Sequence, residues 1–178
     1  MNLRAVILVL GAAALVIIGG VYFASRSGGD ALPASRVRVP PAPDLTLHDY
    51  DGREVKFSDF RGRAILINAW AAWCPFCREE LKDFAAIQKE FSDQMVMIAV
   101  DRAEPRDTAK KFSDELGVSD DLIFLLDPDD TFYRAIGGFS MPETIFVDRE
   151  GLVRFHKRGP MKREEIRRRI EDLLISRE

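Results

Sequence analysis

The two cysteines of this 178-residue chain, Cys74 and Cys77, are separated by two residues and lie at a boundary between two sequence patterns. Before them, Ala64–Trp70 is a short and mostly apolar run, which is typical of a buried central strand. After them, residues 75–91 repeat apolar side chains at helical spacing, with charged residues between them. The chain therefore has to fold so that a buried strand leads directly into a helix beside the cysteine pair.

The rest of the chain after residue 43 alternates between strand and helix patterns, with hairpin turns expected at residues 49–52 and 148–151. Strands are expected at 44–48, 53–57, 64–70, 95–100, 122–126, 144–147 and 152–155, and helices at 75–91, 106–116, 129–136 and 162–175. This order predicts an α/β sandwich in which helices flank a mixed central sheet that includes an N-terminal β-hairpin.

The first segment has a different character. Residues 5–24 contain no charged side chain, and as a helix they would span roughly 30 Å, the thickness of a bilayer core. We predict a transmembrane anchor at residues 1–24. A cleaved signal peptide is the alternative, although its apolar core usually runs about 7–15 residues. A buried soluble helix is a third reading, and basic residues on both flanks leave the orientation open.

Residues 25–43 are rich in Pro, Gly, Ser and Ala and predict a linker, and residues 44–178 are long enough to form one domain. The formal net charge of −3 argues against a protein that binds nucleic acid electrostatically. We expect a monomeric domain without a nucleic-acid partner.

The position of the cysteine pair indicates its chemistry. Cys74 is expected at the N-terminus of the helix, where free backbone N–H groups and the helix dipole stabilise a thiolate. Pro75 suits an early helical position, where its missing N–H costs nothing. Cys77 is expected one turn later, within disulfide reach of Cys74 but shielded. This arrangement suits a nucleophile and a resolving thiol.

Three other readings of the pair are weaker. A purely structural disulfide that closes so short a loop would constrain the unfolded chain little. Half of a zinc site lacks a second cysteine pair, and His48 and His156 are far away in the sequence. Haem attachment would need a histidine at position 78, where the chain has arginine. A redox-active pair, which needs no metal or other cofactor, is favoured.

The run LINAWAAWCPFC resembles the active site of the thioredoxin superfamily, and LTLHDYDGREVKFSDFRGRA resembles its membrane-tethered TlpA/ResA-like branch. That branch includes the cytochrome c maturation reductants of the CcmG type. The resemblance covers most of residues 44–176. It implies a thioredoxin-like fold and the activity of a thiol:disulfide oxidoreductase, with Cys74 and Cys77 as catalytic residues.

A second motif, GFSMPET at residues 138–144, supports the same resemblance. It implies that the Met141–Pro142 bond is cis, that Pro142 lies against the cysteine pair, and that the Met141 backbone binds an extended substrate. We expect Trp73, Pro75 and Phe76 to add an apolar rim for substrate binding around the pair.

The chain departs from its relatives in the acid near the cysteines. Thioredoxins have a buried aspartate where this chain has Asn68, and some ResA-like proteins have glutamate where it has Pro75. Glu143 is therefore our candidate for a catalytic acid, with Asp101 as a weaker one. The alternative for Glu143 is a solvated side chain on an edge strand.

The resemblance also implies partners and a location. The partners are client proteins with disulfides, apocytochrome c among them, and a membrane electron donor of the DsbD/CcdA type. The domain would lie on the extracytoplasmic side of the cell membrane, held by a single-pass anchor, because disulfides persist there. Two other function classes remain, a thioredoxin-fold binding module and a peroxiredoxin-like peroxidase; the Thr-x-x-Cys context of the peroxidase is absent.

Overall fold

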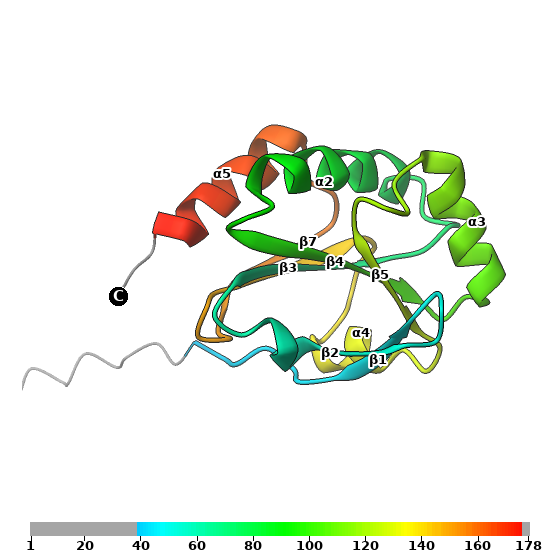
Figure 1. Ribbon diagram of the computed structural model, residues 1–178, viewed down its shortest axis with the longest axis horizontal. Coiled ribbons are helices and arrows are strands. Elements are labelled where there is room, and N and C mark those ends of the chain that lie inside the picture. Colours follow the sequence, from blue (N-terminus) through cyan, green and yellow to red (C-terminus); the bar gives the residue numbers. More distant parts are fainter. Residues whose placement is uncertain (1–38, 176–178) are drawn as a thin grey trace, which may run out of the picture. The chain divides into compact units, whose positions relative to one another are not determined.

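The computed structural model describes residues 39–175, in which a single seven-stranded sheet is flanked by helices (Figure 1). The predicted anchor and residues 25–38 of the predicted linker lie outside this range. Within it, no helix is both long enough and apolar enough to cross a membrane. The elements are β1 (Thr46–Asp49), β2 (Glu54–Lys56), the 3₁₀ helix η1 (Phe57–Phe60), β3 (Ala64–Trp70), α2 (Cys77–Phe91), β4 (Met95–Arg102), α3 (Arg106–Leu116), β5 (Ile123–Asp127), α4 (Thr131–Ala135), β6 (Glu143–Val147), β7 (Val153–Arg158) and α5 (Arg163–Ile175).

The strand order is β2-β1-β5-β4-β3-β6-β7, and the sheet is mixed. Strands β3, β4 and β5 are parallel, whereas the β1–β2 hairpin, β6 and β7 join antiparallel to their neighbours. All seven residues of β3 are buried, as expected for a central strand. The predicted α/β class, mixed sheet and N-terminal hairpin are confirmed.

Two apolar cores lie on opposite faces of the sheet, because successive strand side chains point to opposite sides. Leu66 and Trp70 of β3 face the core formed with α2, α3 and α5, which cover one face together (Figure 1). Ile65 and Ile67 face the other core, which is closed by η1, α4 and the β1–β2 hairpin. The cysteine pair belongs to the first core, at the end of β3.

Most element bounds differ from the sequence prediction by one to three residues, η1 was not expected, and two differences affect the region around the site and the start of the domain. Helix α2 begins at Cys77 rather than at residue 75, because residues 71–76 form turns before the helix starts. Residues 40–42, which we assigned to the linker, are bound to the turn between β6 and β7. Ala42 N donates to Gly151 O at 2.9 Å, and Val153 N donates to Pro40 O at 2.9 Å.

We expect Leu66→Ala to lower the free energy of unfolding by about 2–5 kcal/mol, because Leu66 is fully buried and its removal leaves a cavity. Urea unfolding of the oxidised protein measures this change. Ile175→Ala is the matched control, since Ile175 is 78% exposed, and it should change stability by less than about 0.5 kcal/mol. Equal losses in both variants would contradict the position of Leu66 in the core.

Candidate active site

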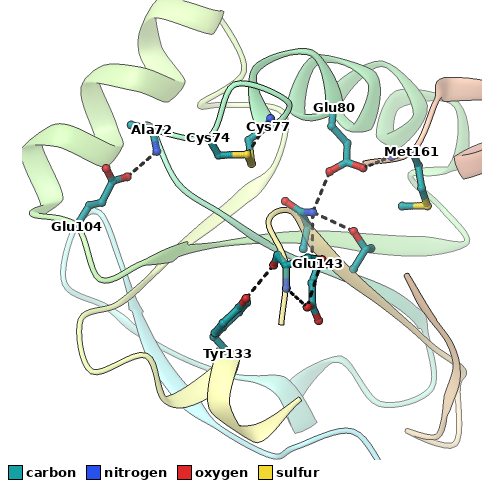
Figure 2. Close-up of a disulfide and its surroundings, with 11 residues drawn as sticks. Ala72, Cys74, Cys77, Glu80, Glu104, Tyr133, Glu143 and Met161 are labelled. Carbon is teal, nitrogen blue, oxygen red and sulfur yellow. Dashed lines mark hydrogen bonds between the residues drawn. A yellow bond between two sulfur atoms is a disulfide. The ribbon is translucent and has the colours of Figure 1, made fainter. Parts of the chain in front are cut away.

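Cys74 and Cys77 form a disulfide at the junction of β3 and α2 (Figure 2). Cys74 lies three residues before the first helical residue, in a turn in which its N–H donates to Ala71 O at 3.1 Å. The N–H of Cys77, the first residue of α2, donates to the sulfur of Cys74 at 3.2 Å. Cys74 is therefore outside the helix, contrary to the sequence prediction. Its sulfur still receives an N–H from the first helical turn, an interaction that favours a thiolate in the reduced pair.

The cysteine pair is buried, whereas the apolar side chains next to it in the sequence are exposed. Cys74 and Cys77 are 2% and 1% exposed, whereas Trp73 and Phe76 next to them are 61% and 59% exposed. Large exposed apolar side chains need an explanation when they gather in one place. The predicted rim residues Trp73, Pro75 and Phe76 are all on the surface.

The second predicted motif lies before β6, and its Met141–Pro142 peptide bond is cis, as the resemblance implies. Pro142 is buried, and Met141 is half-buried and packs against both apolar cores. The loop before Met141 is bound by Tyr133 of α4, whose hydroxyl donates to Ser140 O at 2.8 Å. A side chain at Gly138 would lie 2.5 Å from the Tyr133 ring, so the loop approaches α4 closely.

Glu143 is fully buried, so the alternative of a solvated edge-strand glutamate is wrong. Its Oε1 accepts the backbone N–H groups of Phe139 and Ser140 at 2.5 and 2.6 Å, and its Oε2 lies 2.7 Å from His156 Nε2. The next residue, Thr144, faces α2, so Glu143 points to the opposite side of the sheet; Figure 2 draws its carboxylate away from the disulfide. The predicted proton-transfer role of Glu143 stays a prediction.

The buried acid that shares the face of the cysteine pair is Glu80, which the sequence analysis missed. Glu80 lies on α2 one turn after Cys77 and is 2% exposed. Its Oε2 accepts an N–H from the side chain of Asn68 at 3.2 Å, and its Oε1 accepts the backbone N–H of Met161 at 2.8 Å (Figure 2). Burial raises the pKa of Glu80 to about 8, and the two hydrogen bonds only partly oppose this.

Asn68 therefore does not supply an acid itself, and its side-chain amide instead binds the carboxyl group of Glu80. Besides the bond to Glu80, its Nδ2 donates to Thr144 Oγ1 at 2.9 Å, which joins β3 to β6 below the disulfide. The signal in the sequence was the spacing of Cys77 and Glu80, three residues apart on one helix face. A carboxyl group with a pKa near 8 can exchange a proton with a thiol at neutral pH.

Asp101, the weaker candidate, lies one residue before the end of β4, pairs with Trp70 and is 1% exposed. Burial, followed by hydrogen bonding with Glu104 and its charge, raises the pKa of Asp101 to about 8. Glu104 in turn accepts the backbone N–H of Ala72 at 2.6 Å. Glu104 therefore adjoins the turn that carries Cys74, and Figure 2 shows it on the side opposite to Glu80.

Comparison with known proteins agrees with this geometry. The sequence matches the Redoxin family over residues 39–174. The thiol-disulfide oxidoreductase ResA of Geobacillus thermodenitrificans is 30% identical over 133 residues, covering 74% of this chain and 75% of that protein. The thiol:disulfide interchange protein DsbE of Allochromatium vinosum is 32% identical over 125 residues, covering 68% of this chain and 66% of that protein.

Two solved structures share the fold. A thiol:disulfide interchange protein of the thioredoxin family from Chlorobium tepidum superposes with a TM-score of 0.65 at 26% identity, covering 77% of this chain and 97% of that one. The exposed lipoprotein thioredoxin Etrx1 of Streptococcus pneumoniae has a TM-score of 0.64 at 27% identity, covering 74% and 100%. The predicted thioredoxin-like fold is confirmed for the described residues.

We expect Glu80→Gln to flatten the pH dependence of stability. In the folded protein Glu80 holds its proton up to a pKa of about 8, whereas in the unfolded chain it ionises near 4.5. The contribution of Glu80 to stability is therefore fully present below about pH 4 and is lost as the pH rises to about 8. Glutamine removes this loss, on the order of 4 kcal/mol.

Urea unfolding of the oxidised protein between about pH 4 and pH 9 measures this slope. Glu79→Gln is the control, because Glu79 is on the same helix turn but exposed. A wild-type slope in the Glu80→Gln protein would show that Glu80 ionises normally in the folded state.

Proposed function

Because the chain belongs to the Redoxin family and is a thiol-disulfide oxidoreductase of the ResA/DsbE type, we propose that it reduces the disulfides of client proteins. Its redox pair is Cys74–Cys77, with Cys74 as the attacking thiol and Cys77 as the resolving thiol. The observation that carries this assignment is the N–H of Cys77 directed at the sulfur of Cys74. That contact stabilises negative charge on Cys74 and not on Cys77.

The reaction consists of two exchanges. The Cys74 thiolate attacks one sulfur of the client disulfide, so that a Cys74–client disulfide forms and the other client sulfur leaves as a thiolate. The Cys77 thiolate then attacks the sulfur of Cys74, and the client is released as a dithiol. Two electrons have moved from the pair to the client, and Cys74–Cys77 is again a disulfide.

The second exchange requires that Cys77 lose its proton in a buried place. Glu80, three residues later on the same helix, is the acceptor that we propose, since its raised pKa of about 8 is close to that of a free thiol. Asn68 and the backbone of Met161 hold its carboxylate. Glu143 is then a second acid at the site, which acts through the loop that leads to Pro142.

The client docks on the apolar surface around the pair. We assign Trp73, Pro75 and Phe76 to this surface, together with Met141, whose backbone pairs with an extended client segment, and Pro142. Phe139, which is 85% exposed in the loop before Met141, extends it. Exposed aromatic side chains at the redox pair support a polypeptide substrate over a small thiol.

We further propose that residues 1–24 anchor the protein in the cell membrane, that residues 25–43 are its tether, and that the domain acts on the extracytoplasmic side. The apolar stretch of residues 5–24 and a relative that is an exposed lipoprotein support this location. A tether raises the effective concentration of both client and electron donor. The donor is a membrane protein of the DsbD/CcdA type, and the candidate clients are apocytochrome c, another periplasmic protein or a general pool of proteins with disulfides.

In the reduced protein, we expect iodoacetamide to modify Cys74 at least roughly tenfold faster than Cys77, because Cys74 has the lower thiol pKa. Mass spectrometry of peptides from timed samples gives the two rates. The same protein in urea is the control, where the two rates should become equal. Equal rates in the folded protein would remove the assignment of roles.

For Glu143, we expect Glu143→Gln to slow client reduction and to change its pH dependence, without unfolding the domain. The substitution removes the charge that His156 contacts and weakens the hold on the Phe139 and Ser140 amides. Client reduction rates between about pH 5 and pH 9 test this. A wild-type rate and pH profile would leave Glu143 without a part in the reaction.

A further inference from the structure

Two acids on the side of the active site away from Glu80 have no part in the reaction described above. Asp101 is the residue of β4 that pairs with Trp70 at the end of β3, and its side chain is buried. Ala103 adopts a left-handed conformation, with φ of 57°, and turns the chain after β4. The turn brings Glu104 back over Asp101, so that Glu104 N donates to Asp101 Oδ2 at 3.1 Å.

Glu104 connects this turn to the active-site loop. Its Oε2 accepts the backbone N–H of Ala72 at 2.6 Å, a bond between residues 32 positions apart (Figure 2). Ala72 directly follows Ala71, whose carbonyl accepts the N–H of Cys74 at 3.1 Å. A hydrogen bond from an amide to a carboxylate is stronger than one to a neutral acceptor. Glu104 therefore acts on the one turn that determines where Cys74 lies.

Asp101 lies close enough to Glu104 for the two side chains to interact electrostatically. Its Oδ1 is buried and has no hydrogen-bond partner among residues 39–175. Ionisation of a buried carboxyl group is unfavourable when one of its oxygens has no hydrogen-bond donor. This agrees with the raised pKa of Asp101, which is about 8. Ionisation of Asp101 adds a buried negative charge next to the side chain of Glu104, whereas protonation of Asp101 removes that charge from the turn.

Other charges around Asp101 act in the same direction. Asp127 of β5 and the hydroxyl of Tyr50 in the β1–β2 turn interact with it electrostatically, and Asp127 also raises its pKa. Three cations of the two nearby helices are directed elsewhere, and one of them is Arg106 of α3, whose Nε donates to Tyr50 O at 2.5 Å. Arg78 of α2 lies over the Phe112 ring, and Lys110 of α3 lies over the Tyr50 ring.

We propose that Glu104 is a positioning residue for thiol–disulfide exchange, which fixes the turn of Cys74 through the N–H of Ala72, and that the proton on Asp101 controls how firmly it does so. The inference rests on the proposed role of Cys74 as the attacking thiol. The reactivity of a thiol normally rises with pH to a plateau. Here the rate at Cys74 has a second step above about pH 8, where it falls because the ionised pair no longer holds the turn.

The test uses the reduced full-length protein and the variants Glu104→Ala, Glu104→Gln and Asp101→Asn. The iodoacetamide rates of Cys74 and Cys77 are measured together between about pH 5 and pH 10. We expect Glu104→Ala to slow Cys74 by roughly fivefold, the size expected for one lost hydrogen bond. Glu104→Gln should recover most of the rate, because its amide oxygen also accepts the N–H of Ala72. Asp101→Asn should keep the rate and lose the step above pH 8.

Glu115→Ala on α3 is the matched control, since it removes an exposed carboxylate that only contacts Lys111, and it should behave as wild type. Hydrogen exchange of the Ala72 amide is a second readout, which should become faster in Glu104→Ala and not in Glu104→Gln. If Glu104→Ala does not fold, the loss of the alkaline step in Asp101→Asn tests the proposal by itself.

The inference is overturned if Glu104→Ala matches Glu115→Ala in the Cys74 rate, or if the alkaline step persists in Asp101→Asn. In that case Cys74 would still react faster than Cys77 in every variant, and the proposed function would stand. If instead Cys77 reacts first in the wild-type protein, the proposed function itself is wrong, whatever the variants do.

Discussion

The burial of β3 on both faces is the constraint on which the site depends. A strand that is covered on both sides must pair with a neighbour along each edge, and β3 pairs with β4 in parallel and with β6 antiparallel. Because of these strand directions, the C-terminal end of β4 and the N-terminal end of β6 lie beside the C-terminal end of β3. The cysteine pair, the Asp101–Glu104 turn and the Met141–Pro142 bond are brought together by strand pairing alone.

A buried polar network joins these parts under the disulfide. Asn68 of β3 contacts Thr144 of β6 and Glu80 of α2, and Glu80 contacts the backbone of Met161 before α5. Buried polar groups destabilise a fold unless they are paired, so each member of this network keeps the others in place. The carboxyl group to which we assign proton transfer is therefore also a structural connection between two helices and the sheet.

The order of elements and the two turns of the hairpins could be predicted from the sequence, because they depend on local apolar periodicity and turn residues. The cis bond before Pro142 followed from the family motif. The spacing of Glu80 from Cys77 was its one signal in the sequence, but Glu80 stands among other charged residues of α2, and its burial depends on packing that brings Asn68 and Met161 to it. The bond from Ala72 to Glu104 depends on two loops 32 residues apart, which no local pattern relates.

The exposed aromatic side chains next to the redox pair in the sequence, Trp73 and Phe76, lie in turns and outside the strands. They contribute little to the apolar cores and no strand pairing, whereas the cysteines and Glu80 belong to the buried structure. Substitutions at these surface positions are thus free of the penalty that a core change carries. Under the docking surface that we propose, the choice of client can change from one lineage to another while the electron-transfer chemistry of the buried pair stays the same.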